Sequence, residues 1–342
     1  MKKISRSDLP RLFEALSQAR RLYIPADDGS GQAKFLPYTP GMELTQNLNT
    51  VRSAKDLFFP QVENLLKFKV QGKQIEILDD RDPVEPFVIF GVRACDCRSF
   101  DVLDNVFLHA EPADTFYQAR RENAVVMTLA CNAPEETCFC TVFGIGPADP
   151  AGDVTMWQTK DTLYLRANTE KGAAVLDDLP LDDADDAAVA AQQTATREIL
   201  KKLPLKDLDL NGFDHEHMLQ KFNDPRWAQL SESCLGCGTC TFVCPTCQCY
   251  DIKEFNTGKE IQRFRCWDSC MYSDFTQMSA GQPRPTQKER FRQRFMHKLV
   301  YYPANNDGLY SCVGCGRCLQ KCPIHMNIVK VIKTLGGECH DA

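Results

Sequence analysis

Hydrophobic positions in the N-terminal part of the chain repeat with the spacings of helices and of buried strands. In residues 9–16, after a polar SRSD start, leucine and phenylalanine recur at helical intervals, and RLYIPA (21–26) follows as a short apolar run. Two further runs, PFVIFGV (86–92) and NAVVMTL (123–129), have the composition of central strands. The pattern predicts a helix followed by strands in a mixed α/β domain.

The stretch between the last two runs indicates a strand and helix repeat. CRSFDVLDNVFLHA places Phe100, Leu103 and Phe107 on one helical face, so we expect the order strand, loop, helix, loop and strand. A cysteine-bearing loop follows each run, with Cys95 after the first and Cys131 after the second. Because α/β sheets build sites at the carboxyl ends of their strands, Cys95 and Cys131 are expected to meet there.

Charge and the N-terminal sequence narrow the classes of function. The chain has 342 residues, a length that usually divides into two or three domains, and 40 Lys+Arg against 46 Asp+Glu. This mild acidity argues against nucleic acid as a partner. The start MKKISRSDLPRLFEAL lacks the apolar core of a secretory signal, and no apolar run reaches the about 18 residues of a membrane span. A cytoplasmic protein without membrane insertion is therefore expected.

The 18 cysteines need an explanation, because cytosolic thiols are kept reduced and rarely pair as disulfides. They are strongly grouped, and only Cys339 stands alone. The groups lie at 95–97, 131–140, 234–249, 266–270 and 312–322. Grouped cysteines in a reducing compartment indicate bound metal.

Two of these groups share the ferredoxin spacing C-x2-C-x2-C-x3-C-P. The first contains Cys234, Cys237, Cys240 and Cys244 with Pro245, and the second contains Cys312, Cys315, Cys318 and Cys322 with Pro323. Glycines in each turn allow a tight loop to wrap one corner of a [4Fe-4S] cluster. Zinc ligands usually come as two separated C-x2-C pairs, so the spacing favours iron-sulphur clusters over structural zinc.

The fourth cysteine of each motif is expected to cross to the other cluster, as it does in two-cluster ferredoxins. The sequence therefore predicts two ligand sets that join both motifs into one unit. Cluster 1 is assigned to Cys234, Cys237, Cys240 and Cys322, and cluster 2 is assigned to Cys312, Cys315, Cys318 and Cys244.

The character of the chain changes near residues 210–219, which predicts a domain boundary. We expect an α+β protein, with a mixed α/β domain over 1–215 and an α-helical dicluster ferredoxin domain over 216–342. Between the two motifs, the hydrophobic spacing within 285–300 predicts a helix. Its basic residues either form a solvated face, or offset the charge of clusters, or contact a partner subunit. These residues are Arg284, Lys288, Arg290, Arg292, Arg294 and Lys298.

Two further cysteine sets are candidate sites. Cys95, Cys131, Cys138 and Cys140 could hold a third [4Fe-4S] cluster, a structural zinc, or no metal, because C-x6-C-x-C is not a ferredoxin spacing. Cys97 competes with Cys95 as a ligand. The second set consists of Cys247, Cys249, Cys266 and Cys270, which either form a fourth metal site or are buried free cysteines beside the clusters.

Several segments of the chain resemble a known family. In order, these are GVRACDCRSFDVLDNVF, CNAPEETCFCTVFGIGP, CLGCGTCTFVCPTCQCYD and RCWDSCMYSDFTQMSAGQPRP. They are similar to the iron-sulphur beta subunit of cytoplasmic sulfhydrogenases and to the A subunit of anaerobic sulfite reductase. FFPQVENLLKFK (58–69) also resembles the family, and the match covers roughly residues 55–330. The resemblance favours a third cluster at the first candidate set, while Cys97 and Cys266 depart from the family pattern.

The resemblance implies an electron-transfer subunit of an oxidoreductase complex in anaerobic metabolism. In that family the subunit carries electrons between a flavin subunit, which oxidises NAD(P)H or ferredoxin, and a separate catalytic subunit. The catalytic subunit can be a sulfite reductase, a hydrogenase or a heterodisulfide-reductase-like enzyme.

The alternative is a self-contained oxidoreductase with its own flavin or nicotinamide site. It depends on GIGP (144–147), which lacks the third glycine of a dinucleotide-binding loop and has Pro147 where a helix should begin. No catalytic residue is assigned.

Overall fold

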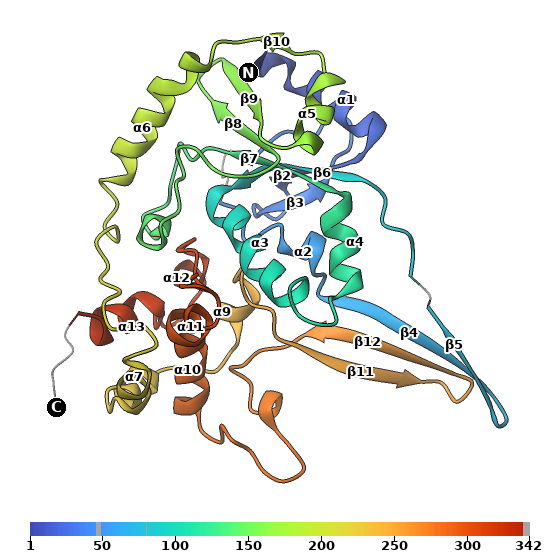
Figure 1. Ribbon diagram of the computed structural model, residues 1–342, viewed down its shortest axis with the longest axis vertical. Helices are drawn as coiled ribbons and strands as arrows, with labels where there is room; N and C mark the ends of the chain where they lie inside the picture. Colours follow the sequence, from blue (N-terminus) through green and yellow to red (C-terminus); the bar gives the residue numbers. More distant parts are fainter. Residues whose placement is uncertain (46–48, 80, 338–342) are drawn as a thin grey trace.

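A computed structural model describes residues 1–45, 49–79 and 81–337, so Cys339 lies outside the described residues. Its largest element is an eight-stranded sheet with the strand order β10-β1-β9-β8-β7-β6-β2-β3 (Figure 1). In that order the strands are Asp182–Asp183, Lys2–Ser5, Thr162–Ala167, Val154–Gln158, Ala124–Leu129, Phe87–Arg93, Arg21–Asp27 and Ala33–Pro37. The central strands β2, β6, β7 and β8 are parallel, and the outer pairs are antiparallel.

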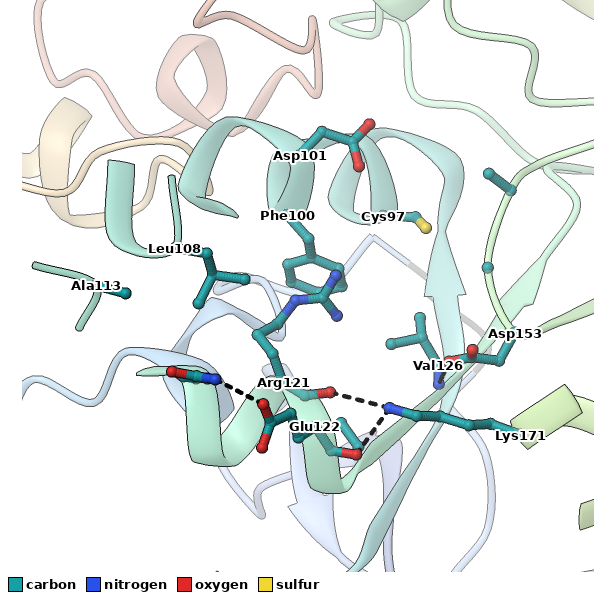
Figure 2. Close-up of a pocket in the computed structure, with 14 residues that line it drawn as sticks. Cys97, Phe100, Asp101, Leu108, Ala113, Arg121, Glu122, Val126, Asp153 and Lys171 are labelled. Atoms are coloured by element: carbon teal, nitrogen blue, oxygen red, sulfur yellow. Dashed lines mark hydrogen bonds between the residues drawn. The ribbon is translucent and has the colours of Figure 1, made fainter. Parts of the chain in front are cut away.

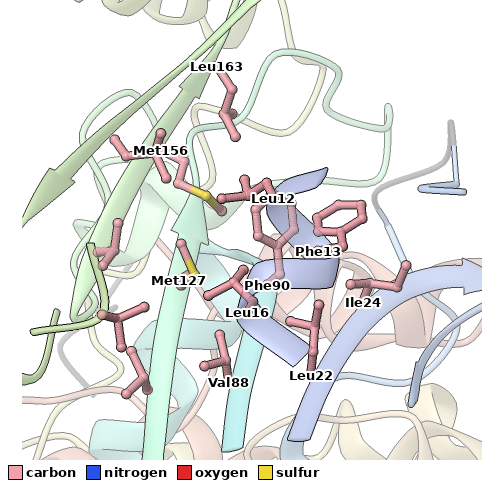
Figure 3. Packing of buried hydrophobic residues seen from close by; sticks show 14 of the residues in the cluster. Leu12, Phe13, Leu16, Leu22, Ile24, Val88, Phe90, Met127, Met156 and Leu163 are labelled. Carbon is pink, nitrogen blue, oxygen red and sulfur yellow. The ribbon is translucent and has the colours of Figure 1, made fainter. Parts of the chain in front are cut away.

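Both faces of this sheet are covered by helices, which explains the continuous apolar runs of β6 and β7. On one face, α1 (Leu9–Ala19) inserts Leu12, Phe13 and Leu16 against the central strands, and α5 (Glu170–Asp177) lies on the same side (Figure 3). On the other face lie α2 (Lys55–Phe58), α3 (Ala94–Phe107) and α4 (Thr115–Asn123), packed through an aromatic core. The predicted helix at 9–16 and the predicted strands at 21–26, 86–92 and 123–129 are confirmed.

The connection after β6 differs from the expected one. No loop separates β6 from α3, because Arg93 ends the strand and Ala94 begins the helix. Cys95 and Cys97 therefore lie in the first turn of α3, and the loop predicted to carry Cys95 is wrong. Since successive positions of a helix point in different directions, this turn gives the two cysteines different surroundings.

A second, four-stranded sheet projects from the body of the molecule, in the order β11-β12-β4-β5 (Figure 1). Its strands are Tyr250–Asn256, Glu260–Trp267, Val62–Gln71 and Gln74–Leu78. The hairpin β11-β12 lies between the ferredoxin motifs, in a stretch for which the sequence predicted no strands. Residues from both sides of position 215 share this sheet, and the division into domains at that position stays a prediction.

The remaining C-terminal part is helical, as predicted, and packs around its own apolar core. The core is rich in aromatic side chains, including Trp227, Phe291 and Phe295. Its helices, with α6 before them, are Ala190–Leu200, Met218–Asn223, Trp227–Ser231, Thr239–Phe242, Gln287–Met296, Tyr302–Ala304, Arg317–Gln320 and Ile328–Leu335, numbered α6 to α13. A π-helix at His297–Tyr301 extends α10. No helix in the described ranges is long and apolar enough to cross a membrane.

Candidate iron-sulphur centres

The two ferredoxin motifs fold into similar loops, each ending in a short helix. Gly236 and Gly238 in the first loop, and Gly314 and Gly316 in the second, have positive φ angles between 57° and 78°. Gly238 and Gly316 precede α9 and α12 directly. A side chain at Gly314 would place Cβ 2.5 Å from the backbone of Phe139, so this loop approaches a neighbouring segment too closely for any other residue.

The structure brings the fourth cysteine of the first motif to the second motif. Burial raises the pKa of the thiols of Cys312, Cys315 and Cys318, and the nearby thiol of Cys244 raises each further. Cys244 is also a neighbour of Cys240 in its own motif, so its role as a ligand of cluster 2 stays a prediction. A buried thiol with a raised pKa becomes a ligand because bound metal deprotonates it.

The first motif shows three of its four predicted ligands together. Cys240 is buried, which raises its pKa, and the thiols of Cys234 and Cys237 are among its electrostatic neighbours. Cys322 donates from its sulphur to the carbonyl of Met326 at 3.3 Å. Its role as the fourth ligand of cluster 1 stays a prediction.

The four cysteines of the third candidate site lie around the side chain of Arg93. Its Nη2 donates to Cys131 Sγ at 3.3 Å and reaches Cys138 Sγ at 4.0 Å. Burial raises the pKa of Cys140 to about 12, and Cys138 and Cys131 contribute to that shift. Burial also raises the pKa of Cys95, whose neighbours include Arg93 and Cys140. The four thiols therefore surround one buried guanidinium.

Cys97 lies elsewhere. It lines a separate cavity of about 450 Å³ together with Asp101, Arg121 and Lys171 (Figure 2). Burial raises its pKa to about 11, and the neighbouring Thr128 opposes part of that shift. Of the two competing cysteines, only Cys95 is placed with the other members of the third site.

Buried arginines without carboxylate partners among the described residues lie beside the cysteines, and they show whether the cysteine sites suit negatively charged clusters. Arg294 is 2% exposed, and its Nε and Nη1 have no hydrogen-bond partner among the described atoms. Its Nη2 donates to the carbonyl of Cys240 at 3.0 Å. Burial acts to lower its pKa, and thiols of both motifs and of Cys247 raise it above the ordinary value. Arg93 likewise leaves Nη1 unpaired. Unpaired buried N–H groups cost about 1–3 kcal/mol each, and sulphides or thiolates of a cluster would accept their hydrogen bonds.

Lys298 and Lys55 add two more buried positive charges. Lys298 Nζ donates to Thr246 Oγ1 at 2.8 Å and to the carbonyl of Ser311 at 2.9 Å. Lys55 Nζ donates to the carbonyl of Cys247 at 2.9 Å and lies 3.5 Å from the ring centroid of Trp267. Burial acts to lower the pKa of both lysines, and the nearby thiols of Cys244 and Cys247 act to raise it. The residues present thus fit negatively charged iron-sulphur groups.

The basic residues of 284–298 therefore do not all have the same surroundings: some lie beside the predicted clusters and others form a solvated face. Arg294 and Lys298 are buried beside the thiols, whereas Lys288 is exposed to solvent. The sequence could not separate these roles. It also gave no signal for Arg93 or Lys55, because each reaches its cysteines only through the tertiary fold.

Three of the four cysteines proposed for a fourth site lie together. Cys270 donates from its thiol to Cys249, Cys247 donates to Cys244, and Cys247 and Cys270 are electrostatic neighbours. Cys266 lies on β12 opposite Asp251 and Val62, and lines a surface groove. In the part of the chain that the structure describes, no three His, Cys, Asp or Glu side chains are arranged to hold a single metal ion.

The paired glycine loops, the two cysteine motifs and the buried cations define a protein of the dicluster ferredoxin class. The family described as a 4Fe-4S dicluster domain matches residues 233–326. Over 335 residues the chain is 31% identical to sulfhydrogenase 2 subunit beta of Pyrococcus furiosus, and the alignment covers 94% of each chain. The chain belongs to this family of sulfhydrogenase beta subunits, which confirms the resemblance seen in the sequence. No solved structure matches it.

Proposed function

We propose that this iron-sulphur protein relays electrons within a hetero-oligomeric complex. One partner would be a subunit that binds FAD and NAD(P), or that oxidises ferredoxin, and the other would be a catalytic subunit. A sulfite reductase, a hydrogenase or a heterodisulfide-reductase-like enzyme would suit the second role. The similarity to a sulfhydrogenase beta subunit supports the place of the chain between two partners.

The observation that carries the proposal is the contact between the third site and the second ferredoxin motif. Cys95 and Cys140 pack in one buried cluster with Val313 and Cys315. The backbone N–H of Phe139 donates to the carbonyl of Gly314 at 2.8 Å. Groups bound at these two sites would be immediate neighbours, as electron transfer between them requires.

A buried ion pair fixes the relative position of the same two segments. Arg317 in α12 is 1% exposed, and its Nη2 donates to Asp96 Oδ2 at 2.7 Å in α3. Arg317 Nε also donates to the carbonyl of Thr50 at 2.7 Å. The residues next to Cys95 and Cys315 are therefore held by the same bidentate contact.

The opposite end of the series reaches the surface. Cys237 is exposed, and the adjacent Leu235 is 66% exposed. The third site, by contrast, is enclosed, since Cys138 packs against Leu200 and Leu203. This gradient supports exchange of electrons with one partner at the first motif.

The clusters would supply one-electron transfer, at potentials that proteins set between about -700 and +450 mV. The chain's own residues supply the rest. Its glycine loops present backbone to the sulphides, its apolar core excludes water, and Arg93, Arg294 and Lys298 place positive charge beside the thiols. Positive charge favours the reduced form and raises the potential.

The alternative of a self-contained flavin or nicotinamide enzyme has little support. Gly144 follows the short 3-10 helix Cys140–Phe143, and the residues directly after GIGP form turns rather than a helix. A phosphate-binding loop needs a helix N-terminus at that point. We therefore expect the purified chain to bind no flavin and not to oxidise NAD(P)H.

Cluster content tests the proposal directly. Anaerobically purified full-length chain should contain about twelve irons and as many acid-labile sulphides, the sum of three four-iron clusters. The double variant Cys138→Ser and Cys140→Ser should lose about four of each, because serine oxygen is a poorer ligand for this core than thiolate.

Cys97→Ser is the matched control and should lose none. If Cys97→Ser removes a cluster and Cys95→Ser does not, the ligand assignment must be exchanged. Stoichiometric zinc without sulphide would end the iron-sulphur interpretation, and fewer than about eight irons would contradict the two ferredoxin clusters.

A further inference from the structure

Cys249 and Cys270 are brought together by the β11-β12 hairpin rather than by a cluster motif. Tyr250 pairs with Trp267 at the base of the hairpin, so the residues just before β11 and just after β12 are neighbours. The N–H of Asp268 donates to the carbonyl of Cys249 at 3.0 Å, which fixes this junction. Cys270, 8% exposed, then donates from its thiol to Cys249.

The surroundings of the pair favour thiolate chemistry. The hydrogen bond from Cys270 lowers the pKa of Cys249 to about 7, against the opposing effect of burial, and the nearby Lys298 contributes in the same direction. A thiolate, not a thiol, is the form that makes and breaks sulphur-sulphur bonds. The pKa of Cys270 is raised, because its hydrogen bond to Cys249 and its burial both keep the thiol protonated.

The pair also has a short route to the second ferredoxin motif. Cys247 is an electrostatic neighbour of Cys270 and donates from its thiol to Cys244. Cys244 in turn lies with Cys312, Cys315 and Cys318. Electrons at Cys249 and Cys270 are thus two sulphur contacts from a predicted cluster ligand.

We propose that Cys249 and Cys270 form a redox-active dithiol and disulfide pair that stores two electrons beside the iron-sulphur series. On oxidation the two thiols release two protons and two electrons, and a bond forms between the two sulphurs. Each of two oxidised clusters would accept one of these electrons. On reduction the disulfide would accept one electron from each of two reduced clusters and take up two protons, and the sulphur-sulphur bond would break. This inference rests on the proposed function, which supplies the clusters as electron acceptors and donors.

Such a pair has a clear use in an electron-transfer subunit. Clusters exchange single electrons, whereas hydride donors such as NAD(P)H deliver electrons in pairs. Oxidation of two thiols to one disulfide releases two electrons, the number that a hydride donor delivers. Cys270 is buried and Cys249 is partly exposed, so access of solvent thiols to the pair is restricted on the Cys270 side.

Alkylation and mass spectrometry test the pair on the full-length, cluster-loaded chain. One sample is poised anaerobically with a mild oxidising dye and another with dithionite. Both are quenched in acid and then alkylated with N-ethylmaleimide in denaturant at neutral pH. We expect a linked pair of peptides, carrying Cys249 and Cys270, in the oxidised sample only. Reductive titration should also take up two electrons more than the clusters account for. Both signals should vanish in Cys249→Ser and in Cys270→Ser.

Cys266→Ser is the matched control, since Cys266 lies in the same hairpin, and it should keep both signals. Iron and sulphide are measured on every sample, so that the two proposals fail separately. If the clusters are present but both cysteines are alkylated after oxidation, the stored-electron pair is wrong and the relay stands. If Cys270→Ser loses metal, Cys270 is a metal ligand and the pair is again wrong. If the wild-type chain lacks clusters, the relay itself fails.

Discussion

Arg93 should set the potential of the third site, because its charge lies against two of the four thiols there. It is 6% exposed and touches Cys131 Sγ at 3.3 Å. Burial alone would lower its pKa, but the thiols of Cys131, Cys95 and Cys138 raise it above the ordinary value. Arg93 therefore stays charged at every accessible pH. In Arg93→Gln this charge is removed and replaced by a shorter, neutral polar side chain.

The size of the effect follows from the contact distance. A guanidinium that touches a ligand sulphur lies roughly 6 Å from the centre of the bound cluster, and at an effective dielectric of about 20 it stabilises an added electron by about 3 kcal/mol. For a one-electron couple about 1.4 kcal/mol corresponds to about 59 mV, so the limiting shift is about 120 mV. Water that enters the vacated space would screen part of it. We expect the potential to fall by about 60 to 120 mV.

The assay is an anaerobic redox titration followed by electron paramagnetic resonance. One component should move to lower potential in Arg93→Gln, and Arg93→Lys, which keeps the charge, should restore most of the shift. Arg98→Gln is the control, because Arg98 lies on the same helix with 45% of its side chain exposed. If Arg93→Gln keeps its irons and no component moves by more than about 20 mV, the electrostatic reasoning is refuted.

Two other expectations concern stability and one concerns cluster content. Asp96→Asn leaves its buried arginine partner unpaired and should reduce the free energy of unfolding by about 3 kcal/mol in urea titrations. Gly314→Ala, at a φ of 57°, should lose irons from the second motif, whereas Gly258→Ala, with open space around it, should not. Burial lowers the pKa of His297 to about 4, so the unfolded chain binds the extra proton below about pH 6.5. Stability should therefore fall by about 2 kcal/mol from pH 7 to 5, and His297→Gln should remove this part of the loss.

The sequence predicted those elements that are buried in a regular pattern, either on both faces of a strand or along one stripe of a helix. Strands β6 and β7 are buried on both faces, so they appear as unbroken apolar runs, and α1 has one apolar stripe. In the hairpin β11-β12, β11 is largely exposed and β12 is mostly half-buried. Both strands mix charged with apolar residues, so they lack a clear alternation of polar and apolar positions. The only strong signal of the hairpin was the Asn-Thr-Gly turn at 256–258, and the interpretation of the surrounding region as helical obscured it.

The candidate site shows the same division. Ligand spacing within one loop is a local property, so the two ferredoxin motifs could be read directly from the sequence. The choice between Cys95 and Cys97 depended on where β6 ends, since a shift from loop to helix changes the direction of each side chain. The meeting of Cys249 with Cys270 depended on the register of an unpredicted hairpin.

The two halves of the chain are joined by interactions that neither half can satisfy alone. Strand β12 pairs with β4 across the second sheet, and the buried Arg265 on β12 binds Glu63 and Asp114 from the N-terminal half. Asp96, fully buried, has its only ion-pair partner among the described residues in Arg317. Separating the halves would leave these buried charges uncompensated, at several kcal/mol each. The third site and the ferredoxin motifs are therefore held together by the same contacts that complete the fold, which ties the spacing of the electron-transfer centres to the stability of the whole chain.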